Sequence, residues 1–240
     1  MALAQNDVWI FTADLDARAH ELQADIKTLS SDEIVRFERF RVEIPARRFV
    51  AARAFLRETL SRLLSASPGS ISFAYGPEGK PSIAEPRPPP ELEFNLSHSA
   101  GLAALAVARD RAVGIDVEHV RDSVEIEALA ERFFSSRERE CLLSMPASGR
   151  RRAFFCCWTR KEAYLKARGG GLTTPLDRFD VTFAPGDAPR LLADRGDPDA
   201  PNAWQIHSVP LSPGTEAALV VAARADEFLS IQINPSTLKE

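Results

Sequence analysis

Two carboxylates stand two residues apart in the segment Gly114-Ile115-Asp116-Val117-Glu118. On a β-strand, Asp116 and Glu118 would point to one face while Ile115 and Val117 point to the other. Like charges this close are unfavourable unless a cation lies between them, and oxygen-only ligands suit Mg²⁺. The segment therefore predicts either a magnesium site at Asp116 and Glu118 or an amphipathic edge strand whose acids are merely solvated.

A third carboxylate and a lysine share one face of a predicted helix. Within residues 155–166, Trp158, Glu162 and Lys166 are spaced four residues apart, so they stack along the helix. Glu162 and Lys166 could supply a third metal ligand and a phosphate contact. The alternative is an ordinary glutamate–lysine pair on a solvated helix surface.

Short polar side chains surround a histidine in Phe94-Asn95-Leu96-Ser97-His98-Ser99-Ala100. The segment lacks the Gly-x-Ser-x-Gly elbow of a hydrolase, which disfavours nucleophilic catalysis by Ser97 or Ser99. Hydroxyl, imidazole and backbone N–H groups could instead bind phosphate. A histidine of the core or of a turn remains the alternative interpretation.

Basic residues gather in the first half of a chain whose overall net charge is −4. This local excess indicates either an anion pocket or a solvated helix face. Its members are Arg36, Arg39, Arg41, Arg47, Arg48, Arg53 and Arg57, with Lys80 in the turn Gly79-Lys80-Pro81.

The elements that must position these residues follow from hydrophobic periodicity and turn signals. Strands are predicted at residues 8–11, 71–75, 179–184, 204–209 and 217–223, and helices at 14–57 and 123–168. The apolar segments 101–108 and 113–117 are predicted to form a buried hairpin joined by residues 109–111.

A self-comparison indicates an internal repeat with a spacing of about 110 residues. Residues 54–57, 71–76, 94–96 and 103–108 match 163–166, 181–186, 204–206 and 217–222 in the same order. We therefore expect an α+β fold of two similar, pseudo-symmetric halves, at residues 1–112 and 113–240. A ligand would most naturally sit in the cleft between them.

Composition excludes several classes of protein. Hydrophobic residues at 45% and charged residues at 27% are typical of a globular chain. The net charge argues against a uniformly basic nucleic-acid binder, and no apolar run is long enough to span a membrane. Three cysteines without zinc spacing, and an N-terminus unlike a signal peptide, predict a cytoplasmic protein.

Together and in this order, the segments resemble the Sfp-type 4′-phosphopantetheinyl transferases. The likeness covers roughly residues 30 to 185. The matching signatures are Gly79-Lys80-Pro81, Phe94-Asn95-Leu96-Ser97-His98-Ser99, Gly114-Ile115-Asp116-Val117-Glu118, Arg132-Phe133-Phe134-Ser135 with Glu138, and Trp158-x-x-Lys161-Glu162-Ala163-x-x-Lys166 ending in Gly170-Gly171-Leu172.

The resemblance implies transfer of the phosphopantetheine arm of coenzyme A to a serine hydroxyl of an apo carrier protein, with release of 3′,5′-ADP. It implies a holo-[acyl-carrier-protein] synthase type of enzyme that depends on Mg²⁺, with Mn²⁺ as the alternative metal. By this resemblance, Asp116, Glu118 and Glu162 would hold the metal and Lys166 would contact the pyrophosphate.

The resemblance also implies contacts to the rest of coenzyme A. Arg48, Lys80 and His98, joined by Arg36, would surround the 3′-phosphate, and Ser97 adjoins His98 in the same motif. The turn from Tyr75 to Lys80 would lie beside the adenine. Glu33 stands where the family has another basic residue. For the base that accepts the serine proton, Glu162, acting directly or through a metal-bound water, is the first candidate and Glu138 the second.

Acyl, aryl or peptidyl carrier proteins are the expected partners of what we expect to be a monomer. Docking is expected to use Phe133, Phe134 and residues 137–152, including three consecutive arginines from Arg150, which could equally be a solvated charge run. Two other functions remain open: another Mg²⁺-dependent phosphoryl or pyrophosphate hydrolase, and a non-catalytic module that binds coenzyme A or a carrier.

Overall fold

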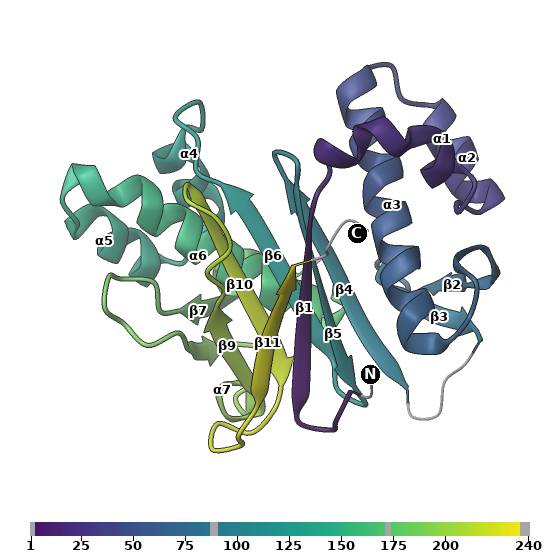
Figure 1. Cartoon of the computed structure of the whole chain (residues 1–240). Coiled ribbons are helices and arrows are strands. Elements are labelled where there is room, and N and C mark those ends of the chain that lie inside the picture. Colours follow the sequence, from purple (N-terminus) through teal and green to yellow (C-terminus); the bar gives the residue numbers. More distant parts are fainter. Residues whose placement is uncertain (1–2, 87–90, 171–173, 236–240) are drawn as a thin grey trace. The chain divides into compact units, whose positions relative to one another are not determined.

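The computed structural model describes residues 3–86, 91–170 and 174–235 (Figure 1). Contacts divide the chain into two compact units. The first comprises Met1–Gly76, Pro81–Asp110 and Leu229–Glu240, and the second comprises Pro77–Lys80 and Arg111–Phe228. Within the described residues, no helix is long and apolar enough to cross a membrane.

The first unit combines a mixed sheet with a layer of helices. Its sheet has the strand order β11-β1-β5-β4, and β2 and β3 form a separate antiparallel pair. The elements are β1 Asp7–Asp14, α1 Leu22–Ile26, α2 Ser31–Glu38, α3 Glu43–Leu64, β2 Ser72–Tyr75, β3 Pro81–Glu85, β4 Leu92–Ser99, β5 Leu102–Arg109 and β11 Ser230–Pro235.

The second unit repeats this plan around an antiparallel sheet of order β6-β10-β9, with β7 and β8 paired separately. Its elements are β6 Val113–His119, α4 Ile126–Phe133, α5 Ser136–Ser144, α6 Ala147–Arg168, β7 Phe179–Val181, β8 Leu191–Asp194, α7 Ala200–Ala203, β9 Trp204–Ser208 and β10 Thr215–Ala222.

In each unit, one long helix packs against the sheet, and the buried core lies between them. In the first unit, Phe55 and Leu60 of α3 pack in one buried cluster with Phe94 of β4. In the second, Tyr164 of α6 lies in a buried cluster with Val220 of β10. Burying these apolar faces is the main favourable term in forming each unit.

The prediction of an α+β fold with two similar halves is confirmed, but the helices align differently from the sequence repeat. Helices α3 and α6 are both 22 residues long, and their first and last residues differ by 104 positions. The self-comparison had matched residues 54–57 with 163–166, a shift of 109. Short sequence matches within the two long helices thus misplaced the register by more than one turn.

The predicted hairpin of residues 101–108 with 113–117 is wrong. β5 pairs with β1 and β4, whereas β6 pairs with β10 in another sheet. The actual hairpin joins β4 to β5 through Ala100 (φ 47°) and Gly101 (φ 91°). Two consecutive residues with positive φ form the tight turn whose twist suits antiparallel strands.

The end of the chain adds a strand to the first unit. β11 pairs in parallel with β1, with Val8 opposite Ile231. The structural division therefore differs from the expected second half of residues 113–240, because a strand made of residues beyond 229 completes the sheet of the first unit. Gly171 and Leu172, which end the last family motif, lie outside the described residues.

Candidate active site

Strand β6 directs Asp116 and Glu118 toward the side of its sheet that carries α6. Gly114 shares that side, since a Cβ atom there would lie 2.2 Å from the Ala163 carbonyl oxygen of α6. Ile115 on the opposite face is fully buried. The alternation expected from the sequence is therefore present, and Asp116 is itself buried, at 5% exposure.

Helix α6 brings Glu162 and Lys166 to the same place. The helix ends at Gly169, whose φ of 68° is the left-handed conformation that glycine adopts without strain. The Lys166 ammonium nitrogen lies 2.5 Å from Asp116 Oδ1 and 3.4 Å from the Ile115 carbonyl oxygen. The two residues predicted to share a phosphate and metal site are thus in direct contact.

The acids form one electrostatic group. Burial raises the pKa of the Glu162 carboxyl, and the negative charges of Asp116 and Glu118 raise it further, while Lys166 acts in the opposite direction. A carboxyl with a raised pKa is a better proton acceptor than a solvated glutamate. Glu162 therefore has the environment expected of a general base.

The same group provides the donors that a hard divalent cation prefers. Three carboxylates from two elements supply only oxygen ligands, and their mutual repulsion would be relieved by a bound cation. Among the described residues, no three His, Cys, Asp or Glu side chains already converge as a ligand set. The donor chemistry fits Mg²⁺, with Lys166 acting as the positive charge next to Asp116.

A fourth acid adjoins the group, and the sequence reasoning missed it. Glu216 of β10 is directly opposite Glu118 in the antiparallel register, so both side chains emerge on one face. Arg152 of α6 holds it, with Nε 2.6 Å from Glu216 Oε1. Only the strand pairing could have revealed this neighbour, because 98 residues separate Glu118 from Glu216.

Comparison with known families covers nearly the whole chain. Residues 112–222 match the model of the 4′-phosphopantetheinyl transferase superfamily. Residues 15–110 match that of the N-terminal part of a 4′-phosphopantetheinyl transferase. This chain belongs to the 4′-phosphopantetheinyl transferases. It is accordingly an enzyme that transfers 4′-phosphopantetheine to carrier proteins.

Individual relatives agree. The transferase is 38% identical to the 4′-phosphopantetheinyl transferase HetI of Nostoc sp., over 92% of this chain and 90% of that protein. It is 32% identical to the 4′-phosphopantetheinyl transferase Sfp of Bacillus subtilis, over 64% of this chain and 66% of that one. A holo-[acyl-carrier-protein] synthase structure from Thermotoga maritima matches 47% of this chain and 63% of that one, at 28% identity and a TM-score of 0.39.

In the first unit of the transferase, Arg48 has an acidic partner. Its guanidinium binds Asp16 in a bidentate pair, with both nitrogen–oxygen distances 2.7 Å. The hydrogen bonds from Arg48 lower the pKa of the Asp16 carboxyl. The predicted role of Arg48 at the 3′-phosphate stays a prediction, and Asp16 would compete with that phosphate for the guanidinium.

Ser97 and His98 point to opposite faces of β4. Ser97 is buried, together with Asn95 and Ser99, whereas His98 is exposed. The polar side chains of this segment therefore alternate between buried and exposed along the strand. Because consecutive strand residues alternate, the two side chains cannot approach a ligand from the same face.

Of the remaining predicted coenzyme A contacts, Lys80 belongs to the second unit, and Tyr75 and Arg36 belong to the first. Lys80 donates hydrogen bonds to the Val113 carbonyl (3.1 Å) and to the Ala167 carbonyl at the end of α6 (3.0 Å). Tyr75 is 53% exposed at the end of β2. Arg36 is exposed on α2, with its guanidinium carbon 5.1 Å from the centre of the Phe49 ring. Their roles toward coenzyme A remain predictions.

Some arginines of the first unit are structural and contribute nothing to a free anion pocket. Glu33, at 3% exposure, forms ion pairs with Arg53 and Arg57. Arg57 is fully buried. Glu33 therefore joins α2 to α3 at the position where the family has a basic residue.

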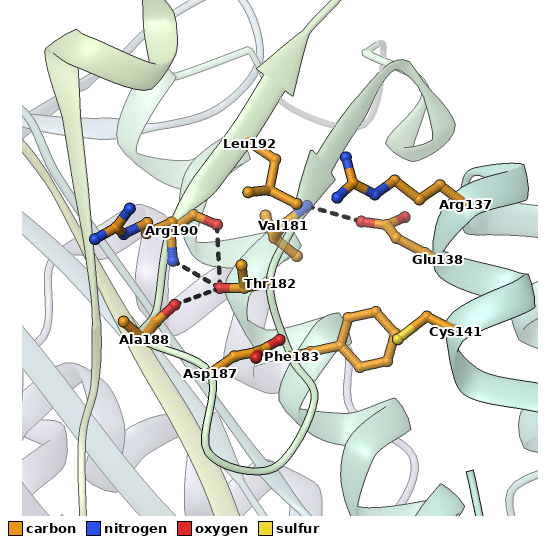
Figure 2. A pocket seen from close by; sticks show the side chains of 10 residues that line it. All are labelled: Arg137, Glu138, Cys141, Val181, Thr182, Phe183, Asp187, Ala188, Arg190 and Leu192. Carbon is orange, nitrogen blue, oxygen red and sulfur yellow. Dashed lines mark hydrogen bonds between the residues drawn. The ribbon is translucent and has the colours of Figure 1, made fainter. Parts of the chain in front are cut away.

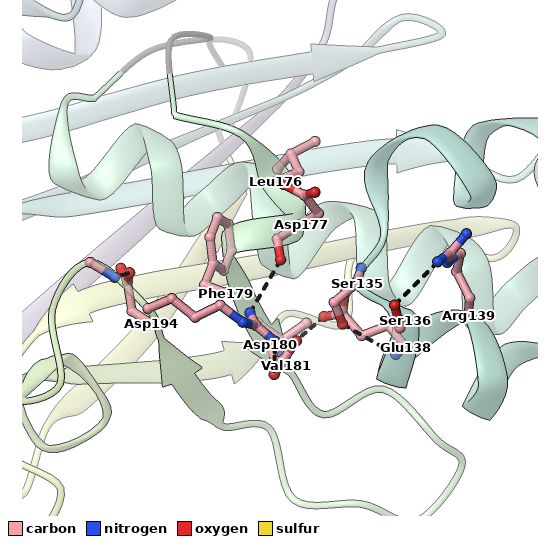
Figure 3. A network of polar contacts seen from close by, with 12 residues as sticks. Ser135, Ser136, Glu138, Arg139, Leu176, Asp177, Phe179, Asp180, Val181 and Asp194 are labelled. Atoms are coloured by element: carbon pink, nitrogen blue, oxygen red, sulfur yellow. Dashed lines mark hydrogen bonds and ion pairs between the residues drawn. The ribbon is translucent and has the colours of Figure 1, made fainter.

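Glu138 is also structural, which corrects its prediction as second candidate base. It is 1% exposed, and its carboxylate accepts hydrogen bonds from the backbone N–H groups of Ser135 and Val181, both at 2.9 Å (Figure 3). The Lys161 ammonium nitrogen forms an ion pair with the same carboxylate, 2.8 Å from Glu138 Oε2. A carboxylate enclosed in this way has no free edge for a carrier serine.

Lys161 is a second residue whose contacts the sequence did not reveal. It is fully buried one position before Glu162, and it donates to the carbonyl oxygens of Leu176 (2.8 Å) and Phe179 (2.5 Å). The family motif contains Lys161, but the resemblance implies no role for this residue. A lysine at 0% exposure cannot contact coenzyme A.

The expected carrier-docking residues are only partly available. Phe134 is buried and stacks on Phe154 at 5.1 Å, so it belongs to the core. Of the three consecutive arginines, Arg151 donates to the Arg121 and Val124 carbonyls and Arg150 to those of Leu143 and Met145. Phe133, partly buried against Trp158, remains at the surface.

Figure 2 shows a pocket of about 310 Å³ that is separate from the acidic group. It lies among α5, β7 and residues 182–192, with Cys141 and Phe183 in its wall. Glu138 borders it but points to the Val181 amide. This pocket is not lined by any of the four charged residues that strand β6 and helix α6 bring together, which are Asp116, Glu118, Glu162 and Lys166. We therefore do not assign the reaction to it.

Proposed function

We propose that this transferase is of the holo-[acyl-carrier-protein] synthase type and that it depends on Mg²⁺, with Mn²⁺ as an alternative. Coenzyme A would be the donor and the serine hydroxyl of an apo acyl, aryl or peptidyl carrier the acceptor. One observation carries the proposal: Asp116 and Glu118 share the face of β6 that meets Lys166 and the electrostatically coupled Glu162 of α6.

The proposed step is a phosphoryl transfer. The serine oxygen forms a bond to the phosphorus that carries the pantetheine arm, the bond from that phosphorus to the bridging oxygen breaks, and 3′,5′-ADP leaves with the electron pair. Glu162 accepts the serine proton. Its raised pKa supports this role, because it brings the carboxyl closer to the operating pH.

Asp116, Glu118 and Glu162 would hold the cation. When bound, Mg²⁺ would supply charge neutralisation at the pyrophosphate. Lys166 would shift part of its contact from Asp116 to a pyrophosphate oxygen, since an ammonium group can donate to several acceptors. Catalysis would then rest on positioning and electrostatics, as in other phosphoryl transfers.

For coenzyme A, we propose contacts from basic and polar side chains outside the acidic group. Arg36, Arg48, Lys80 and His98 would face the 3′-phosphate, with Ser97 nearby and Tyr75 beside the adenine. The exposed position of His98 and the partial exposure of Arg48 support contacts with a dissolved ligand. Burial of Ser97 makes it the weakest member of this set.

The test measures release of 3′,5′-ADP from coenzyme A with and without an apo carrier, in Mg²⁺ and in EDTA. We expect release only when both carrier and divalent cation are present. Release into water without a carrier would favour a hydrolase, and full activity in EDTA would contradict the metal assignment.

A further inference from the structure

The two halves of the chain contain the same buried ion pair between a short helix and the long one. Glu33 is the third residue of α2 and pairs with Arg57 of α3; Glu138 is the third residue of α5 and pairs with Lys161 of α6. All four side chains are at most 3% exposed. Each glutamate also accepts a hydrogen bond from the backbone N–H of the serine that caps its helix.

Both cations hold an equivalent turn as well. A short 3₁₀ helix follows each long helix, at Pro68–Ser70 in the first half and at Leu176–Arg178 in the second. In each half, the cation donates to the carbonyl group of the first residue of this 3₁₀ helix and to that of the residue just after it. This places the chain that leaves the long helix against the side of that helix. The acceptors are Pro68 (2.9 Å) and Ile71 (2.8 Å) for Arg57, and Leu176 (2.8 Å) and Phe179 (2.5 Å) for Lys161.

The two cations occupy equivalent positions in the two long helices. Arg57 and Lys161 are each the fifteenth residue of a 22-residue helix. The next residue differs in its use: Glu58 binds Arg18 (3.1 Å), whereas Glu162 faces the acids of β6. The Glu33–Arg57 pair is therefore purely structural, whereas the Glu138–Lys161 pair adjoins Glu162, the proposed base.

We propose that the Glu138–Lys161 pair is a positioning pair that fixes the rotation of α6 and so aims Glu162 at Asp116. Lys161 and Ala163 lie about 100° to either side of Glu162 around the helix. On one side, the buried ammonium ties α6 to Glu138 and to the 176–179 segment. On the other, Ala163 packs against Gly114 with no room for a Cβ atom.

The chemistry of the pair suits a positioning role. The three donors of Lys161 meet Glu138, Leu176 and Phe179. The carboxylate of Glu138 is likewise fully engaged (Figure 3). A buried ion pair with all its groups satisfied contributes little net stability over an apolar pair, yet it defines one geometry. Removing one partner would leave a buried charge, so the informative variant removes both charges.

The experiment compares the double variant E138Q/K161M with the corresponding variant E33Q/R57M of the first half, both in the full chain. E33Q/R57M also removes the acidic partner of Arg53, so its loss of stability should be at least as large. Circular dichroism and thermal melting establish that each variant folds and by how much its Tm falls. For carrier modification, we expect E138Q/K161M to lower kcat by about 100-fold, the scale of a small misplacement of a reacting group, with the KM for coenzyme A within about twofold. E33Q/R57M should retain the wild-type kcat at saturating coenzyme A.

A solely structural role would give a different result. It predicts equal kcat losses in the two double variants at equal loss of Tm, or a wild-type kcat in a folded E138Q/K161M protein, and either result would overturn the proposal. If E138Q/K161M does not fold, K161R decides, because it keeps the charge and changes the length and shape of the arm. We expect K161R to lower kcat and also to lower the Tm, because a larger group must fit a fully buried site. A wild-type kcat would again overturn the proposal.

Discussion

The Lys166 ammonium lies 2.5 Å from Asp116 Oδ1 and thereby joins helix α6 to strand β6 at the acidic group. Asp116 is 7% exposed in its side chain and Lys166 is 29% exposed, so the pair lies at the edge of the interior. A lysine at such an edge can hold an acid in the free enzyme and still reach an incoming phosphate.

Loss of either central acid should abolish most of the activity. We expect Asp116→Ala and Glu162→Ala each to lower the rate of carrier modification by on the order of 100-fold, the scale of removing one electrostatic stabiliser. Steady-state kinetics at saturating coenzyme A measures this. Glu127→Ala, which removes an exposed acid of α4, is the control and should keep the wild-type rate. Wild-type rates in both central variants would remove these residues from the reaction.

The raised pKa of Glu162 predicts a pH-dependent gain in stability on its removal. A carboxyl whose pKa is higher in the folded than in the unfolded state stabilises the fold below the unfolded pKa, and this contribution is lost as the pH rises through the folded pKa. Without metal or coenzyme A, Glu162→Gln should therefore raise the Tm at pH 7. The difference should shrink toward about pH 4, near the unfolded pKa of a glutamate. A Tm gain of equal size at both pH values would contradict the electrostatic origin.

The Asp16–Arg48 pair predicts opposite effects on coenzyme A binding. Asp16→Asn should lower the Kd for coenzyme A because it releases the guanidinium, whereas Arg48→Gln should raise it. Both residues are partly exposed, so the change in unfolding free energy should stay below about 1 kcal/mol. Isothermal titration measures the Kd values. An unchanged Kd in both variants would exclude Arg48 from the ligand site.

The contact between Gly114 and α6 predicts a strong effect of a single methyl group. In Gly114→Ala, the added Cβ would lie 2.2 Å from the Ala163 carbonyl oxygen and 2.3 Å from the Ala167 nitrogen, so α6 must move away from β6. We expect a loss of about 2 kcal/mol in unfolding free energy and a lower kcat. Gly149→Ala on the same helix has open space around it and should be neutral or slightly stabilising.

Local patterns predicted which of these charged side chains lie close together better than they predicted the pairing of strands. Alternation in β6 and the four-residue spacing in α6 were sufficient to place Asp116, Glu118, Glu162 and Lys166, because both patterns are properties of a single element. The hairpin of residues 101–108 with 113–117 failed because an apolar strand carries no signal for its partner when both faces are buried.

Long-range contacts explain the remaining differences. The sequence predicts Glu138 as a candidate base. Its contacts with Lys161 and Val181, and its position in a capping box, instead give it a structural role. Glu216 became visible only through the register of β6 and β10. Strand β11 follows the same rule, because the sequence after Arg224 did not predict a strand and its pairing with β1 is a long-range contact.

The most direct test of the central claim is the intact mass of an apo carrier protein after incubation with this enzyme, coenzyme A and Mg²⁺. We expect each carrier to gain the mass of one phosphopantetheine group with the wild-type enzyme, and we expect this gain to be lost with Glu162→Ala. An unchanged carrier mass with several unrelated apo carriers would contradict the account.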